Sequence, residues 1–111
     1  PQDINDDPAS DAGLNRGPEE RAITGHRPPS DDAARPIIRS KCSAEWVDDF
    51  KMQKYCQDKQ FEALANLRAR NMAGGAYATI RKKCTDEWGA DYKMRDYCEE
   101  NQVEAYRELN R

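Results

Sequence analysis

The chain has 111 residues, of which 35% are charged and 37% hydrophobic, and its formal net charge is −3. A chain of this length has room for one small domain or two very small ones. No apolar run is long enough to cross a bilayer, so we expect no insertion into a membrane.

Residues 1–36 differ in composition from the rest of the chain. They contain all six prolines but no aromatic residue and no cysteine, and their 8 acidic and 4 basic residues give a net charge of −4. A segment this polar cannot bury enough apolar surface to offset its conformational entropy. The sequence therefore predicts a disordered N-terminal tail over residues 1–36, separable from a folded part over 37–111.

The folded part consists of two copies of one segment. Residues 38–67 and 80–109 align without a gap at a period of 42 residues, and 15 of the 30 positions are identical. A self-match at a fixed period indicates that one supersecondary unit has been duplicated. We therefore expect one unit over residues 37–70, a glycine-containing linker over 71–75, and a second unit over 76–111.

Each copy has the pattern of two helices. Ile38, Cys42 and Trp46 are spaced by four residues and predict a short helix that starts near Pro36. A longer helical pattern follows in each copy, through Met52, Tyr55, Cys56, Gln60, Ala63, Leu64 and Leu67 in the first and through Met94, Tyr97, Cys98, Gln102, Ala105, Tyr106 and Leu109 in the second.

The segments between these helices carry turn signals. Asp48 or Asp49, and Asp91 in the second copy, are placed to cap the longer helices, and Gly89 interrupts the helical pattern. The glycines of the 71–75 segment are expected to end the first long helix in a left-handed cap. The predicted fold is all-α, with two tandem helical hairpins that each contain a short helix, a tight turn and a longer helix.

The four cysteines fit this hairpin. Cys42 and Cys56 would lie about 21 Å apart in one unbroken helix, but a disulfide requires Cα atoms within about 7 Å. A Cys42–Cys56 bond, repeated as Cys84–Cys98, therefore requires the predicted turn. The alternative pairing joins the two copies through Cys42–Cys98 and Cys56–Cys84.

Paired cysteines on antiparallel helices resemble the coiled-coil-helix-coiled-coil-helix domains, which have twin C-x9-C motifs. The spacing in this chain is C-x13-C, and the resemblance covers residues 42–98. It gives the alternative pairing a precedent in architecture, and it implies nothing about function.

Several chemistries are not supported by the sequence. No two cysteines have the close spacing of zinc ligands, C-x-x-C is absent, and the single histidine is His26. Acidic residues are interleaved with the basic cluster Arg39, Lys41, Arg81, Lys82 and Lys83, so we interpret it as a solvated helix face and expect no binding of nucleic acid. We expect no metal, no cofactor, no catalytic residue and no enzymatic activity.

A few shared or aromatic residues are candidates for contact with a partner or ligand: Trp46, Trp88, Tyr92, Glu45 and Glu87. For the two tryptophans we favour packing against the disulfides over exposure as anchors. A pocket lined by all five residues would indicate a ligand site between the repeats. Gln60 and Gln102 either bond a neighbouring helix or contact a partner, and the sequence does not separate these alternatives.

The functional expectation follows from these features. An even number of cysteines in a short chain that does not begin with Met is typical of a periplasmic or secreted protein whose signal peptide has been removed. We expect a non-catalytic structural or protein-interaction module, whose N-terminal arm, residues 1–36, binds a protein partner or assembly. The alternative is a small ligand-binding protein or enzyme with its site at the repeat interface.

Overall fold

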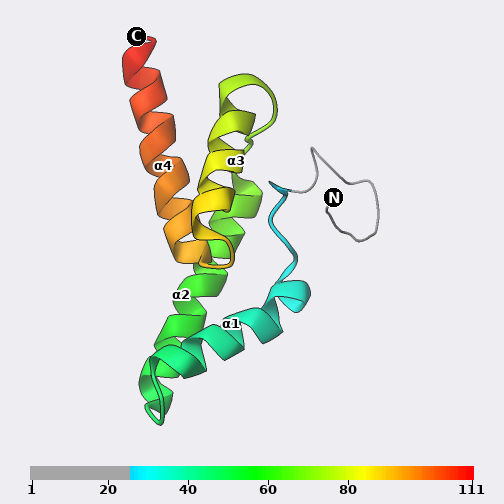
Figure 1. Ribbon diagram of the computed structural model, residues 1–111, viewed down its shortest axis with the longest axis vertical. Coiled ribbons are helices and arrows are strands. Elements are labelled where there is room, and N and C mark those ends of the chain that lie inside the picture. The colour runs from blue at the N-terminus through cyan, green and yellow to red at the C-terminus, as the bar shows by residue number, and fades with distance from the viewer. Residues whose placement is uncertain (1–25) are drawn as a thin grey trace.

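The computed structural model describes residues 26–111, which form four α-helices and no strand (Figure 1). The helices are α1 (Asp31–Glu45), α2 (Phe50–Ala69), α3 (Gly75–Trp88) and α4 (Tyr92–Leu109). A shorter helix precedes a longer one in both hairpins, with 15 and 20 residues in the first and 14 and 18 in the second. The predicted all-α fold of two helical hairpins is therefore confirmed.

Each hairpin contains its own disulfide. Cys42 is bonded to Cys56 and Cys84 to Cys98, with Cα–Cα distances of 5.6 and 5.7 Å. The alternative pairing between the two copies is therefore wrong. Closing a loop of this length stabilises the fold by about 3 kcal/mol in an estimate based on chain entropy.

The two long helices begin at equivalent caps, although the turns before them differ. Asp49 accepts a hydrogen bond from Met52 N at 3.1 Å, and Asp91 accepts one from Met94 N at 3.3 Å. In the second turn Gly89 has φ 50° and ψ −119°, a conformation that only glycine adopts readily. In the first turn Asp48 has φ 61°, which aspartate tolerates better than most residues.

The predicted start of the first helix near Pro36 is wrong, because α1 begins at Asp31. Ser30 caps it by accepting a hydrogen bond from Ala33 N at 3.1 Å. The acidic residues of the first turn interact favourably with the positive end of the helix dipole. Residues 31–36 of the predicted tail are thus helical, and Ala34 is fully buried. Residues 1–25 of that prediction lie outside the described residues.

The linker also differs from the prediction. α2 ends at Ala69, and Arg70 follows it in an extended conformation instead of a glycine in a left-handed cap. The two glycines of this linker, Gly74 and Gly75, have positive φ and lie at the start of α3. Met72 in this linker is buried against the second hairpin.

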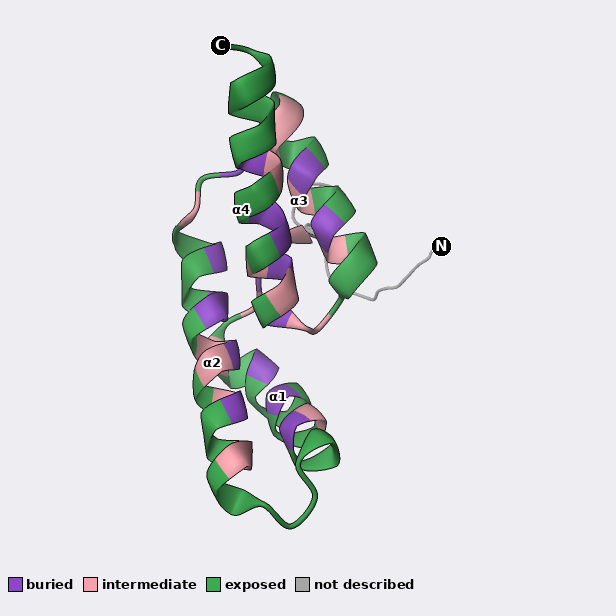
Figure 2. Ribbon diagram, turned by 90° about the vertical axis from the view of Figure 1, so that its left-hand side faces the viewer, coloured by how far each residue is buried: buried purple, intermediate pink, exposed green. Residues whose placement is uncertain are grey.

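The hairpins pack mainly through α2 and α4 (Figure 2). The second core contains Met72, Ile80, Cys84, Cys98 and Val103. The first core contains Ala34, Ile38, Cys42, Cys56, Ala63, Leu64, Leu67 and, from the second hairpin, Tyr92. The start of α4 therefore completes the core of the first hairpin.

Candidate interaction surfaces

The turn before α4 packs against both helices of the first hairpin. Tyr92 is only 3% exposed, and Gln60 beside it is 4% exposed. Gln60 Oε1 accepts a hydrogen bond from Tyr92 N at 2.8 Å, and Gln60 Nε2 donates to Asp91 Oδ1 at 3.0 Å. Because a helix start leaves its first backbone N–H groups without helical partners, Gln60 both satisfies and positions this end of α4. The alternative in which Gln60 bonds a neighbouring helix is confirmed.

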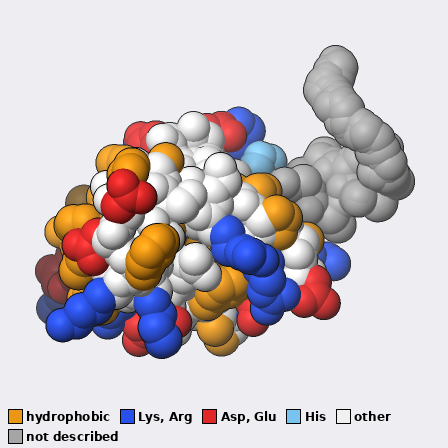
Figure 3. All heavy atoms as spheres, turned by 90° about the horizontal axis from the view of Figure 1, so that it is seen from below, with side chains coloured by type: hydrophobic (Ala, Val, Ile, Leu, Met, Phe, Trp, Pro, Cys, Tyr) orange, Lys and Arg blue, Asp and Glu red, His pale blue; other side chains and the backbone are white. Residues whose placement is uncertain are grey.

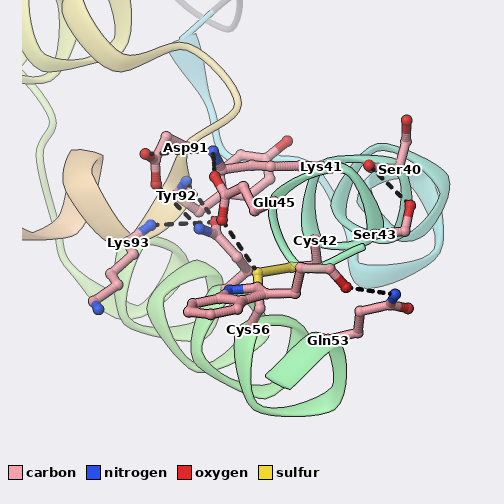
Figure 4. Close-up of a disulfide and its surroundings, with 12 residues drawn as sticks. Ser40, Lys41, Cys42, Ser43, Glu45, Gln53, Cys56, Asp91, Tyr92 and Lys93 are labelled. Atoms are coloured by element: carbon pink, nitrogen blue, oxygen red, sulfur yellow. Dashed lines mark hydrogen bonds and ion pairs between the residues drawn. A yellow bond between two sulfur atoms is a disulfide. The ribbon is translucent and has the colours of Figure 1, made fainter. Parts of the chain in front are cut away.

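Lys41 on α1 connects the first hairpin to the same turn. Its Nζ lies 2.6 Å from Glu45 Oε2 and 3.7 Å from Asp91 Oδ2 (Figure 4). The hydrogen bond to Glu45 is the largest influence on the pKa of Lys41 and, together with Asp91, raises it against the effect of burial. Lys41 therefore contributes a second polar contact between the two hairpins.

A buried ionic cluster joins α2, α3 and α4. Glu99 is fully buried and accepts hydrogen bonds from Arg70 Nη1 at 3.0 Å and Arg81 Nε at 2.9 Å. Arg70 also pairs with Asp96 at 2.6 Å. Burial acts to lower the pKa of Arg70, but hydrogen bonds with Asp96 and Glu99 outweigh it, so the pKa is raised. The interpretation of Arg81 as part of a solvated helix face is wrong.

Arg95 of α4 is buried against the turn between α3 and α4. Its guanidinium lies over the Tyr92 ring at 5.4 Å and donates to Gly89 O at 3.2 Å. Burial is the main cause that lowers the pKa of Arg95, and the nearby charge of Glu99 opposes this only in part. Arg95 thus fixes the shape of the turn that the first hairpin holds.

The sequence analysis did not identify Glu99 and Arg95 as packing residues. Their counterparts in the first copy are Gln57 and Gln53. The two positions are one turn apart on the long helix, and they are buried only in the second copy. The difference between the repeats was therefore the available signal.

The two tryptophans are more exposed than expected. Trp46 and Trp88 lie at the ends of α1 and α3 and are 39% and 40% exposed, so their assignment to the core is wrong. Tyr92, in contrast, is buried in the contact between the hairpins and is not accessible to a ligand.

The two glutamates have equivalent positions beside the disulfides. Glu45 and Glu87 pair with Lys41 and Lys83, one turn earlier in the same helix. Their Oε1 atoms lie 3.7 and 3.8 Å from Sγ of Cys56 and Cys98. These contacts within each hairpin account for both glutamates without a ligand or partner.

Three surface cavities of the described residues have volumes of about 500, 380 and 320 Å³, and none of the three is lined by Trp46, Trp88, Tyr92, Glu45 or Glu87. The 500 Å³ cavity is lined by arginines, but Arg68, Arg70 and Arg81 all pair with carboxylates of the chain.

The 320 Å³ cavity is an apolar groove near the free end of the second hairpin. We call it the second-hairpin groove; it is lined by Ala76, Thr79 and Ile80 of α3 and by Gln102, Ala105, Tyr106 and Leu109 of α4. Leu109 is 84% exposed and Tyr106 is 36% exposed. In Figure 2 the residues at this end of α4 are coloured mostly as exposed. The predicted apolar face of α4 is therefore largely open to solvent.

A second exposed apolar surface lies at the opposite end of the molecule. We call the residues Trp46, Val47 and Phe50 at the turn between α1 and α2 the first-turn surface. Val47 is 69% and Phe50 75% exposed. Seen from this end, hydrophobic side chains lie among lysines, arginines and acidic residues (Figure 3). The first-turn surface thus has the mixed character of a protein-contact surface.

Other site types find no support among residues 26–111. No group of three or more potential metal ligands is gathered there, and none of the four helices combines the length and hydropathy needed to cross a membrane. Comparisons of the chain with known protein families, curated proteins and solved structures found no match.

Proposed function

We propose that this chain is a non-catalytic structural or protein-interaction module that binds a protein partner in an extracytoplasmic setting. The observation that carries the proposal is the second-hairpin groove. In the first hairpin the equivalent residues, 42 positions earlier, bury a segment of protein. In the second hairpin Ile80 is buried, but Ala105, Tyr106 and Leu109 of the corresponding groove are exposed. A groove that holds a protein segment in one copy suits a protein segment in the other.

The disulfides support the extracytoplasmic setting. Both cysteine pairs are disulfides, and such bonds persist in oxidising compartments. The proposed N-terminal arm rests on composition alone, because residues 1–25 lie outside the described residues. Helix α1 already includes residues 31–36, so an arm that contacts a partner would be confined to residues before Ser30.

Site-specific photo-crosslinking in the organism that makes the protein tests this proposal. A photoreactive amino acid at position 106 lies in the groove, and the same probe at exposed position 82 on α3 is the control. We expect a discrete protein adduct from position 106 and none from position 82. Absence of an adduct at 106, or equal labelling from both positions, would contradict binding through the groove.

A further inference from the structure

We propose that the partner of the second-hairpin groove is the first-turn surface of a second copy of this chain, so that copies associate head to tail. This inference rests on the proposed interaction function and names the partner. It starts from the way the two hairpins of one chain already bind each other. In that contact the groove of the first hairpin holds the turn of the second.

The two grooves correspond residue by residue. The residues that line the second-hairpin groove lie 42 positions after Ala34, Ile37, Ile38, Gln60, Ala63, Leu64 and Leu67. Apart from Ile37, all of these first-hairpin residues are at most 4% exposed. Tyr92 belongs to the same core, and Ala90 of the second turn packs against it. Leu109, the counterpart of the fully buried Leu67, is 84% exposed. The second hairpin therefore retains an open version of a groove that its neighbour has filled.

The two turns show the reverse relation. Tyr92 of the second turn is 3% exposed in the first-hairpin groove, whereas its counterpart Phe50 in the first turn is 75% exposed. Asp49 is the counterpart of Asp91, and both cap the helix that follows. The chain thus contains one open groove and one free turn of the kind that fits it.

The open groove and the free turn cannot meet within one copy. The α1–α2 turn lies at one end of the molecule, while the start of α3 and the end of α4 lie at the other (Figure 1). Contact between them therefore requires a second copy, and each added copy again presents one groove and one turn. Such a heterologous contact produces an open chain of subunits unless its rotation closes a ring.

Polar contacts of the internal junction have counterparts in this external one. The Gln60 contact with Asp91 and Tyr92 N corresponds to Gln102 with Asp49 and Phe50 N of the second copy. Within the described residues the Gln102 side chain has no hydrogen bond. The Lys41–Asp91 pair corresponds to Lys83 with Asp49.

A third contact changes its chemistry in a complementary way. The hydrogen bond between Asn66 and Asp96 corresponds to Glu108 opposite Lys54 of the second copy. Here both residues differ from the internal junction, and together they make a pair of opposite charges. Within one copy, Lys54 pairs with Asp58 and Glu108 pairs with Arg111, and both ion pairs are exposed. Replacing such a pair by a contact with a second copy costs little free energy.

One part of the internal junction has no counterpart, and this sets the strength of the association. Gln57 replaces Glu99, so the buried ionic cluster is not reproduced between copies. We therefore expect an association that depends on concentration. It should be weaker than the contact between the two hairpins of one chain, which the polypeptide holds together.

Sedimentation equilibrium of the oxidised full chain, from micromolar to millimolar concentration, tests the inference. We expect the average mass to rise with concentration. Phe50→Asp removes the apolar side chain that the turn would place in the groove, and Ala105→Arg fills the groove. Each substitution should lower the association constant at least about tenfold, as loss of a central contact does. Tyr97→Asp, at an aromatic residue that is 60% exposed outside both surfaces, is the control and should change nothing.

Mixing the two variants distinguishes head-to-tail contact from symmetric pairing. Phe50→Asp retains a groove and Ala105→Arg retains a turn, so an equimolar mixture should form dimers and nothing larger. A charge exchange adds an independent check: Lys54→Glu should weaken the association, and Lys54→Glu with Glu108→Lys should restore it.

Three results would overturn the inference: a monomer at every concentration, an association that the turn and groove variants leave unchanged, or a mixture that does not form dimers. A monomer that still gives a groove-specific adduct with another protein would overturn self-association alone and leave the proposed function standing. Failure of both experiments would remove both proposals.

Discussion

Gln60 and Gln102 are the same residue at equivalent positions of the two repeats, yet their surroundings differ. Gln60 is buried and forms hydrogen bonds with three groups at the start of α4, whereas Gln102 lines an open groove. The contribution of this side chain to stability is therefore decided by whether a turn lies against it. The proposed contact between copies would give Gln102 the role that Gln60 has within the chain.

Substitution of the two glutamines provides a matched comparison. Gln60→Ala should lower the free energy of unfolding by about 1–3 kcal/mol, because it leaves the buried Tyr92 N–H without an acceptor. Gln102→Ala should stay within about 0.5 kcal/mol of the parent protein, as exposed substitutions do. Urea denaturation followed by circular dichroism at low protein concentration measures both. Equal losses in the two variants would contradict the assignment of Gln60 to the junction.

At the scale of the elements, the helical periodicity and the cap residues predicted the hairpins because both are local. The start of α1 was missed although Ser30, Asp31 and Asp32 form an N-terminal signal, since the proline-rich composition around them outweighed it. Pro36 was placed in the first helical turn, but it lies in the sixth position of α1, where it removes one backbone hydrogen bond.

The candidate surfaces could be predicted only in part, because exposure depends on which repeat follows which. Spacing placed Tyr106 and Leu109 on the apolar face of α4 in the same way that it placed Leu64 and Leu67 on α2. Only the packing shows that one face is covered and the other is open. For the same reason, the residue type of Trp46 and Trp88 suggested burial, although both lie at exposed helix ends.

Two truncations test the assignment of α1. Removal of residues 1–36 in place of 1–25 deletes the Ser30 cap, the buried Ala34 and the ion pair between Asp31 and Arg68 at 2.9 Å. Loss of the cap alone costs about 1 kcal/mol, which corresponds to about 4–8 °C in a domain of this size. We therefore expect the melting temperature of the shorter protein to be lower than that of the 1–25 deletion by at least this amount. Equal melting temperatures would mean that residues 26–36 add nothing to the fold.

At the scale of the whole molecule, covalent and noncovalent links are arranged differently. Each disulfide lies within one hairpin, and none joins the two. The hairpins are held together instead by Tyr92 in the first core and by the Glu99 cluster. Because Tyr92 completes the first core, the first hairpin loses part of its core when the second unfolds.

This arrangement predicts that the hairpins unfold as one unit, even when only one disulfide is removed. Replacing Cys84 and Cys98 with Ser releases a constraint worth about 3 kcal/mol in the second hairpin. We expect the first hairpin to unfold at the same lower urea concentration, since unfolding of the second hairpin withdraws Tyr92 from its core. The half-exposed tryptophans report on the hairpins separately: in a Trp88→Phe background Trp46 follows the first, and in a Trp46→Phe background Trp88 follows the second. Coincident fluorescence transitions in the two backgrounds are the expected result.

A first hairpin that keeps the midpoint of the fully oxidised protein would contradict this prediction. It would show that the junction does not stabilise the first hairpin, and that each disulfide-clipped hairpin folds alone.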